Sequence, residues 1–193
     1  MLEPDLLLTA YRHGVFPMAI GEGRRRQIGW FSPDPRAVIP LDERFHVPHG
    51  LRRTLKKNTF EIIVDQNFEK VIRACAKRKE GTWISKEIMM SYCELHRFGH
   101  AHSVEVRLKK KLAGGLYGVA IGGVFFGESM FHRETDASKV ALVALVERLR
   151  DRGFVLLDTQ WLTPHLKQFG TYEIPRNEYL WRLEHALKLK CKF

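Results

Sequence analysis

Hydrophobic and polar residues follow a helical period at the start of the chain and soon lose it. Residues 4–13 predict a helix that ends at Gly14, because glycine readily adopts the left-handed conformation common just past a helix end. Residues 15–50 are rich in Pro and Gly and predict loops rather than one long regular element. Residues 59–64, TFEIIV, are typical of a strand.

The next segment predicts two helices and then a change of period. Asp65 is placed to cap a helix over residues 66–79, and Ser85 is placed to cap a second helix that ends at Gly99. The hydrophobic period then becomes two, which predicts a three-stranded antiparallel meander over residues 102–108, 112–120 and 124–131.

Helices and strands alternate in the remainder of the chain. An apolar helix is predicted from Ala137 to Gly153, followed by a buried strand over 154–161, a short helix opened by Thr163, and a strand and terminal helix within 172–190. This order predicts a mixed α+β (α/β) fold, with a central, mostly antiparallel sheet covered by helices. We expect residues 1–60 to form a small N-terminal lobe and residues 61–193 to form the main domain.

The charge balance favours a polyanionic partner. The chain has 32 Lys and Arg against 22 Asp and Glu, a formal charge of +10, and the excess is clustered at residues 24–26, 51–57, 77–79 and 109–111. Lys and Arg neutralise phosphates, so the four clusters together favour a nucleic acid. Each cluster alone is also explained as a solvated face or, for residues 109–111, as a hairpin turn.

Cysteine usage and the N-terminus indicate the compartment. Cys75, Cys93 and Cys191 are few, odd in number and scattered, which is typical of a reducing environment. The first residues are acidic where a secretory signal carries basic residues. No apolar run approaches the roughly 20 residues of a membrane span. We therefore expect a cytoplasmic protein with no membrane partner.

Asp158 and Gln160 are the strongest local indication of chemistry. On a regular strand they project to the same face, and they follow an apolar run at the end where open sheets place ligand sites. A carboxylate that holds the amide NH₂ would turn the amide oxygen toward the proton of an incoming amine or hydroxyl. The alternative is that the two residues cap the next turn or pair with a basic side chain.

Glu128 interrupts an apolar strand, GGVFFGESMF. On a regular strand it shares a face with Phe126 and Met130, so it lies at an exposed edge, in an ion pair with a basic residue, or in a polar pocket. A buried acid beside a cleft is a candidate for function.

Other candidates have simpler explanations. His96, His100 and His102 lie close in sequence, but no Cys or acid completes a zinc set, and we expect no metal. The glycines of residues 114–127 fit no phosphate-loop pattern and are expected in turns and bulges. Trp83 and Trp30 are either platforms for stacking a base or ordinary core aromatics.

At the level of motifs, the chain resembles the leucyl/phenylalanyl-tRNA–protein transferase family. The N-terminus is shorter than is usual for that family. The matching segments follow the family order along nearly the whole chain: GVFP 14–17, WFSPDPRAV 30–38, EGTWIS 80–85, LHRFGHAHSVEV 95–106, GGLYGVAIGGVFFGESMF 114–131, ASKVAL 137–142, DTQ 158–160, TPHL 163–166 and EIPR 173–176.

The resemblance implies an enzyme that transfers Leu, Phe or sometimes Met from an aminoacyl-tRNA to the α-amino group of a protein beginning with Arg or Lys. This transfer marks the acceptor for degradation under the N-degron rule. The resemblance further implies that residues 61–193 have a fold like that of acyl-CoA N-acetyltransferases and Fem-type peptidyltransferases. No cofactor or metal is implied, and nothing requires more than a monomer.

The resemblance also implies roles for individual residues. Asp158 and Gln160 would be the catalytic acid–amide pair, with Gln160 held against the attacking amine. Glu128 would bind the acceptor's amine or cationic side chain, or the ribose of the terminal adenosine, and Trp83 would stack on that adenosine. Gly127, Ser129 and Thr163 are further substrate-binding candidates. The transferred side chain would lie among apolar residues unbranched at Cβ: Leu116, Met130, Leu142, Leu145, Leu149 and Leu157.

The chain departs from the family pattern in two places. Met18 stands where the family usually has a Trp that helps hold the adenosine, which shifts that role toward Trp30. Gln168-Phe169-Gly170 stands in place of Ser-Leu-Gly. The segment after Met18 carries three arginines that we expect to contact phosphates of the tRNA acceptor stem: Arg24, Arg25 and Arg26.

Two other functions compete with this interpretation. An acyl-CoA-dependent N-acyltransferase would need a Q/R-x-x-G-x-G/A pyrophosphate loop before the long helix, and HRETDASK at residues 132–139 does not supply one. A non-catalytic RNA-binding protein would account for the charge but not for the acid and amide.

Overall fold

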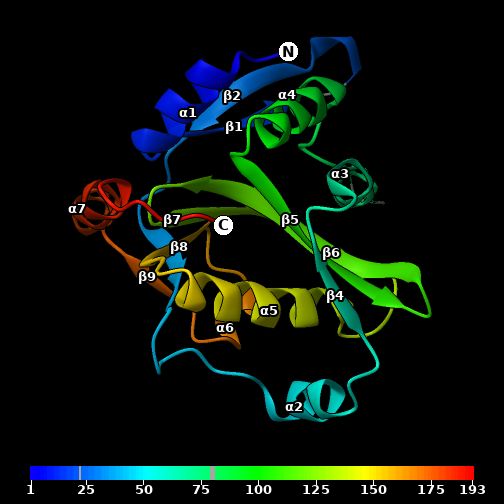
Figure 1. Cartoon of the computed structure of the whole chain (residues 1–193). Coiled ribbons are helices and arrows are strands. Elements are labelled where there is room, and N and C mark those ends of the chain that lie inside the picture. The colour runs from blue at the N-terminus through cyan, green and yellow to red at the C-terminus, as the bar shows by residue number, and fades with distance from the viewer. Residues whose placement is uncertain (22, 79–80) are drawn as a thin grey trace.

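The computed structural model describes residues 1–21, 23–78 and 81–193 (Figure 1). The helices are α1 (Pro4–Arg12), the 3₁₀ turn η1 (Gly23–Arg25), α2 (His49–Lys56), α3 (Phe68–Ala76), α4 (Lys86–Arg97), α5 (Ala137–Asp151), α6 (Pro164–Lys167) and α7 (Arg176–Leu187). The strands are β1 (Phe16–Ile20), β2 (Gln27–Phe31), β3 (Arg36–Ile39), β4 (Glu61–Val64), β5 (Ala101–Leu108), β6 (Lys111–Ile121), β7 (Val124–His132), β8 (Leu156–Gln160) and β9 (Tyr172–Ile174).

A seven-stranded sheet organises the fold. Its strand order is β4-β5-β6-β7-β8-β3-β9, and every neighbouring pair is antiparallel except β7 and β8. Strands β5, β6 and β7 form the predicted meander, and Lys109 and Lys110 make the first turn with φ angles of 50° and 65°. Positive φ at both positions suits a tight hairpin. The predicted mixed α+β fold with a mostly antiparallel sheet is confirmed.

Helices cover both faces of this sheet (Figure 1). Helices α1, α3, α4 and α7 lie on the face that we call the upper face, and α2, α5 and α6 lie on the lower face. Side chains alternate across a strand, so the neighbours Phe125 and Phe126 of β7 enter different cores. Phe126 packs in the upper core and Phe125 in the lower core. The sheet therefore separates two hydrophobic cores.

The segment outside the central sheet is shorter than the expected lobe of residues 1–60. Helix α1 and the two-stranded sheet β1–β2 lie outside it, but β3 pairs with β8 and β9 inside it. Helix α2, which the sequence showed only as a basic cluster, packs beside α5 on the lower face, where Thr54 Oγ1 donates to Asp136 Oδ2 at 3.0 Å. The pairing of β3 depends on partners more than 100 residues away, which local patterns do not reveal.

Most predicted helix ends are confirmed. Gly14, Gly99 and Gly153 follow α1, α4 and α5 with φ angles of 72°, 76° and 75°. Ser85 Oγ accepts a hydrogen bond from the Ile88 N–H at 3.1 Å and caps α4. No helix among the described residues is both long enough and apolar enough to cross a membrane.

The prediction that Asp65 caps α3 is wrong. Asp65 has a φ of 58° and turns the chain, and α3 begins three residues later at Phe68. Its carboxylate instead accepts a hydrogen bond from the Ser103 N–H at 2.8 Å and lies 2.7 Å from His102 Nδ1. The acid thus ties the β4–α3 turn to β5.

Candidate active site

A cavity opens where β7 and β8 separate. Within residues 81–193, which the structure describes without a gap, the two strands pair only from Val124 and Leu156 to Phe126 and Asp158. Beyond these pairs, residues that follow Phe126 in β7 and Asp158 in β8 line opposite sides of a cavity of about 980 Å³. The parting of parallel strands in a sheet is a common ligand site because backbone and side-chain groups of both strands become accessible there.

Glu128 occupies a β-bulge in β7. Gly118 pairs with Gly127 and Tyr117 pairs with Ser129, so Glu128 has no opposite residue on β6. A bulge changes the alternation of side chains along its strand. Glu128 therefore shares the upper face with Phe126, whereas Met130 packs in the lower core, so the predicted common face with Met130 is wrong.

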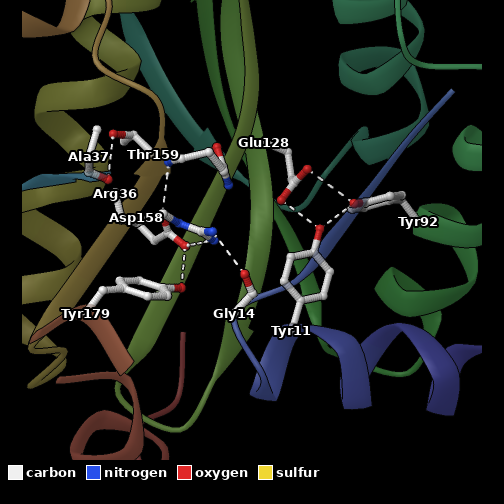
Figure 2. A network of polar contacts seen from close by, with 10 residues as sticks. Tyr11, Gly14, Arg36, Ala37, Tyr92, Glu128, Asp158, Thr159 and Tyr179 are labelled. Carbon is white, nitrogen blue, oxygen red and sulfur yellow. Dashed lines mark hydrogen bonds and ion pairs between the residues drawn. The ribbon is translucent and has the colours of Figure 1, made fainter. Parts of the chain in front are cut away.

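Two tyrosines hold the Glu128 carboxylate (Figure 2). Tyr11 Oη from α1 donates to Oε1 at 2.7 Å, and Tyr92 Oη from α4 donates to Oε2 at 3.1 Å. The two hydroxyl groups also hydrogen-bond to each other. Burial raises the pKa of Glu128 to about 7, although the hydrogen bonds from the two tyrosines favour the ionised form and lower it. No described basic residue forms an ion pair with Glu128.

Asp158 is an anchor of the fold. Its carboxylate accepts four hydrogen bonds: from Arg36 Nε at 2.9 Å, Arg36 Nη2 at 2.7 Å, the Tyr179 hydroxyl at 2.8 Å and the Gln160 backbone N–H at 2.9 Å. Arg36 in turn donates to the Gly14 carbonyl at 2.9 Å, as Figure 2 shows. Asp158 is 0% exposed and does not line the cavity. Asp158 therefore pairs with a basic side chain, Arg36, which was the alternative to a direct role in chemistry.

Gln160 lies in the cavity wall without holding Asp158 by its side chain. Thr159 is the extra residue of a bulge between β3 and β8, and Gln160 has a φ of 61°. The bulge and the left-handed backbone turn the Gln160 side chain away from the carboxylate. Its Nε2 atom is buried without a hydrogen-bond partner among the described residues. The expected contact between the two side chains is therefore absent, and Asp158 instead fixes the Gln160 backbone.

The lower part of the cavity is apolar. Helix α5 contributes Leu142 and Leu145 to it, but Leu149, one turn further along, is buried outside the cavity. The other predicted pocket residues lie in the wall from three different strands: Leu116, Met130 and Leu157. The sheet order brings these strands together over α5, so five of the six predicted apolar residues line one surface.

Only one of the two predicted tryptophans lines the cavity. Trp83 lies in the cavity wall, whereas Trp30 on β2 is 40% exposed and does not. Trp161, which sequence reasoning missed, lines the cavity with 42% exposure and rests edge-on against Phe16, with ring centroids 5.2 Å apart. Its place directly after Gln160 was the available sequence signal.

Polar candidates also lie in the cavity wall. Gly127, Ser129 and Thr163 all lie in its wall, and Thr163 also caps α6. Arg78, which the sequence showed only as part of the basic cluster 77–79, donates to Ser129 Oγ at 2.9 Å. Lys77 beside it also lines the cavity.

The predicted arginine cluster lies near Trp83. Arg25 and Arg26 are exposed, and the Arg26 guanidinium donates to the Thr82 carbonyl, directly before Trp83. The side chain of Arg24 lies outside the described part of the structure. Met18, at the position where a Trp was expected, lines the cavity.

The histidines of residues 96–102 form no metal site in the described residues. His96 Nδ1 lies 2.8 Å from the Ala101 carbonyl oxygen, and His102 Nδ1 lies within hydrogen-bond distance of the Asp65 carboxylate. These contacts join the end of α4 to β5 and give both rings structural partners.

Comparisons with known proteins agree over the whole chain. Residues 38–184 match the leucyl/phenylalanyl-tRNA protein transferase family model, and residues 1–34 match the model of that family's N-terminal domain. A leucyl/phenylalanyl-tRNA–protein transferase of Akkermansia muciniphila is 56% identical over 189 residues, 97% of each chain. The one of Gloeobacter violaceus is 57% identical over 192 residues, 100% of this chain and 97% of the relative.

Solved structures support the expected fold. FemX superposes with a TM-score of 0.55 over 93% of this chain and 70% of its own, at 12% identity. L-PGS from Bacillus licheniformis gives a TM-score of 0.50 at 8% identity, over 96% of this chain and 71% of its own. With more than half of its sequence shared with named relatives and both family models matched, the chain belongs to the leucyl/phenylalanyl-tRNA–protein transferase family, and it is a transferase.

Proposed function

We propose that the protein transfers Leu, Phe or Met from an aminoacyl-tRNA to the α-amino group of proteins that begin with Arg or Lys, and so marks them for N-degron degradation. Family membership supports the reaction class. The observation that carries the proposal is the composition of the cavity between β7 and β8. It joins an apolar wall to one carboxylate, Glu128, and one amide, Gln160.

The apolar wall suits the transferred side chain. Leu116, Met130, Leu142, Leu145 and Leu157 carry no branch at Cβ, and such side chains adjust to ligands of different shape more readily than Val or Ile. Burial of a Leu, Phe or Met side chain there contributes roughly 1.5–3 kcal/mol to binding. This wall therefore accounts for a preference for large, flexible apolar residues over polar ones.

The polar groups of the cavity suit the ester end of the donor and the amine of the acceptor. Glu128 carries the negative charge that a protonated N-terminus or a basic first side chain requires. Contact with the terminal ribose is the other role consistent with its place. Gln160 is the group proposed to touch the reacting atoms, and Asp158 is a positioning residue that holds the Gln160 backbone. Positioning two substrates side by side supplies a large share of the rate of such an aminolysis.

The terminal adenosine is proposed to stack on Trp83 and on the exposed face of Trp161. Base–aromatic stacking contributes about 1–3 kcal/mol per base, so Trp161→Ala should raise KM for charged tRNA roughly 5-fold to 150-fold. Trp30→Ala is the matched control, because Trp30 is equally exposed but lies outside the cavity. Equal effects of the two substitutions would contradict this assignment.

Basic residues near the mouth are proposed to contact the acceptor stem. Removing Arg25 and Arg26 should weaken tRNA binding and reduce the slope of log K against log salt by about one for each phosphate that these residues neutralise. A charge-matched control is Lys109→Asn with Lys110→Gly, which removes two charges but supplies the residues that this turn geometry favours. A slope that both variants share with the wild type would make Arg25 and Arg26 part of a solvated loop.

Incubation of the protein with labelled Leu-tRNA and an Arg-starting peptide tests the function directly. Label should appear on this peptide and not on the same peptide with an acetylated N-terminus. Labelled acetyl-CoA in a parallel reaction tests acyl-CoA-dependent transfer. Folded protein that labels no peptide from Leu-tRNA would overturn the proposal.

Oligomeric state and location are separate expectations. A monomer is the expected active form, and sedimentation analysis of the active protein measures this. The three free thiols suit the cytoplasm, which fractionation of cells tests.

A further inference from the structure

The proposed reaction needs a group that accepts a proton. An N-terminal α-ammonium group has a pKa of about 7.7–8.0 and is largely protonated at neutral pH. Its nitrogen becomes a nucleophile only after one proton has left. Neither an amide nor an arginine can accept that proton. The base must therefore be sought among the titratable residues that face the cavity.

We propose that Glu128 is the general base that removes this proton from the acceptor, and not only an ionic contact for it. The inference rests on the proposed function. Glu128 is the single carboxylate among the described residues that line the cavity. Asp158 is excluded because it is 0% exposed and already accepts four hydrogen bonds from protein groups.

The hydrogen bonds of Glu128 leave room for a substrate. An ionised carboxylate has about four acceptor positions, and the Tyr11 and Tyr92 hydroxyls occupy one on each oxygen. The tyrosines belong to α1 and α4, which lie on the upper face, and neither tyrosine lines the cavity, whereas Glu128 does. The remaining positions are therefore available to an amine that enters between β7 and β8.

The electrostatic surroundings tune the same group. Burial raises the pKa of Glu128 to about 7, close to that of an α-amine, so proton transfer between them is nearly balanced. Tyr11, Tyr92 and Arg36 favour the ionised carboxylate, and Asp158 opposes it. The titratable and charged groups that face it come from five elements: Tyr11 of α1, Tyr92 of α4, Tyr117 of β6, Asp158 of β8 and Arg36 of β3.

Protons and electron pairs balance in the proposed step. The carboxylate takes one proton from the ammonium group, and the freed nitrogen lone pair forms a bond to the ester carbonyl carbon while the carbonyl π pair moves to oxygen. That pair then re-forms the carbonyl and expels the ribose oxygen, which leaves with the electrons of the broken C–O bond. The leaving oxygen receives the second proton of the nitrogen. Glu128 returns the first proton to solvent, so each turnover releases one proton.

The test compares wild-type and Glu128→Gln protein over a range of pH with two acceptors. One is the Arg-starting peptide, and the other is the same peptide with an aminooxy group in place of the α-amine, which is neutral at pH 7 without a base. With the amine, kcat/KM of the wild type should rise through pH 7, and the variant should lose about 100-fold or more at pH 7. With the aminooxy acceptor the two proteins should differ little.

The outcomes are distinct. Transfer by the wild type establishes the function, and the ratio of variant to wild type decides the role of Glu128. A loss of the same factor with both acceptors would overturn the proposal and leave Glu128 as a binding contact. An unchanged pH profile in the variant would also overturn it, and the two histidines of the same cavity, His132 and His165, would become the candidate bases.

Tyr11→Phe gives a second measurement if Glu128→Gln folds poorly. The phenol lowers the pKa of Glu128 by donating a hydrogen bond, so its loss should move the rising limb of the pH profile to higher pH. A limb that stays in place in Tyr11→Phe would contradict the assignment.

Discussion

The contacts of Asp158 predict that Asp158→Ala disrupts the fold before it disrupts chemistry. The substitution removes four hydrogen bonds and leaves Arg36, 1% exposed, without its carboxylate. Arg36 also lies over the rings of Phe16 and Tyr179, at 5.1 and 4.4 Å from their centroids, so it is enclosed by packed side chains. Removing one partner of a buried ion pair costs about 3–5 kcal/mol.

This loss is large beside a total stability of about 5–15 kcal/mol. For a chain of 193 residues, 1 kcal/mol corresponds to about 2–4 °C in Tm, so Asp158→Ala should lower Tm by about 6–20 °C. Transfer and tRNA binding should then fall together, because Arg36 joins Gly14 to β8.

A thermal scan with activity and tRNA-binding assays measures these quantities. Asp42→Ala is the matched control, because Asp42 binds Arg44 through its side chain in the same way but at the surface, where such pairs contribute little. The control should shift Tm by no more than about 4 °C. Replacing both partners, Arg36→Met with Asp158→Leu, should recover part of the stability. If Asp158→Ala abolished transfer but lowered Tm no more than the control, the structural role of Asp158 would be refuted. Asp158 would then take part in the chemistry.

Further predictions follow from the packing of the site. Leu142→Ala and Leu149→Ala should each lower the free energy of unfolding by about 2–5 kcal/mol. Only Leu142→Ala should change the preference among Leu, Phe and Met donors, because Leu149 lies outside the cavity. A changed preference in both variants would contradict the assignment of Leu142, and not Leu149, to the cavity wall. Gly118→Ala should lower stability by several kcal/mol, because its Cβ would overlap the Phe125 ring and the Phe126 carbonyl. The control Gly50→Ala on α2 places its Cβ near no other atom and should be neutral or stabilising by up to about 1 kcal/mol. Urea unfolding measures both. The pKa of Glu128 is raised to about 7 by folding, so its ionisation lowers stability as pH rises from the ordinary carboxyl range through 7. Glu128→Gln should therefore be stabilised relative to wild type at pH 8, by up to about 3 kcal/mol, and not at pH 4; equal Tm differences at the two pH values would show that the group is not perturbed.

The local pattern of the sequence was sufficient for most elements. Strict alternation predicted β5, and apolar runs separated by turn residues predicted β6 and β7. The glycines after α1, α4 and α5 marked helix ends because they adopt positive φ. Strands β1, β2 and β3 and helix α2 were missed. Strand β3 is four residues long and is stabilised by β8 and β9, which are distant in the chain.

The candidate site was predicted in part. Motifs located Glu128, Gln160 and five apolar wall residues, all of which line the cavity. Trp161 was not singled out, and Arg78 was noted only as part of a basic cluster. The pairing of the Asp158 and Gln160 side chains was wrong because it assumed a regular strand. The bulge at Thr159 and the positive φ of Gln160 separate the two groups.

The order of residues along the chain was enough to show which side chains are able to do chemistry, where the chain turns, and that its charge suits a polyanion. How the two acids differ emerged only from the folded chain. Arg36, 122 residues from Asp158, neutralises that carboxylate, whereas tyrosines of α1 and α4 leave Glu128 open to the cavity. Charge neutralisation, burial and strand register depend on partners far away in the chain, and an amino-acid pattern describes only near neighbours.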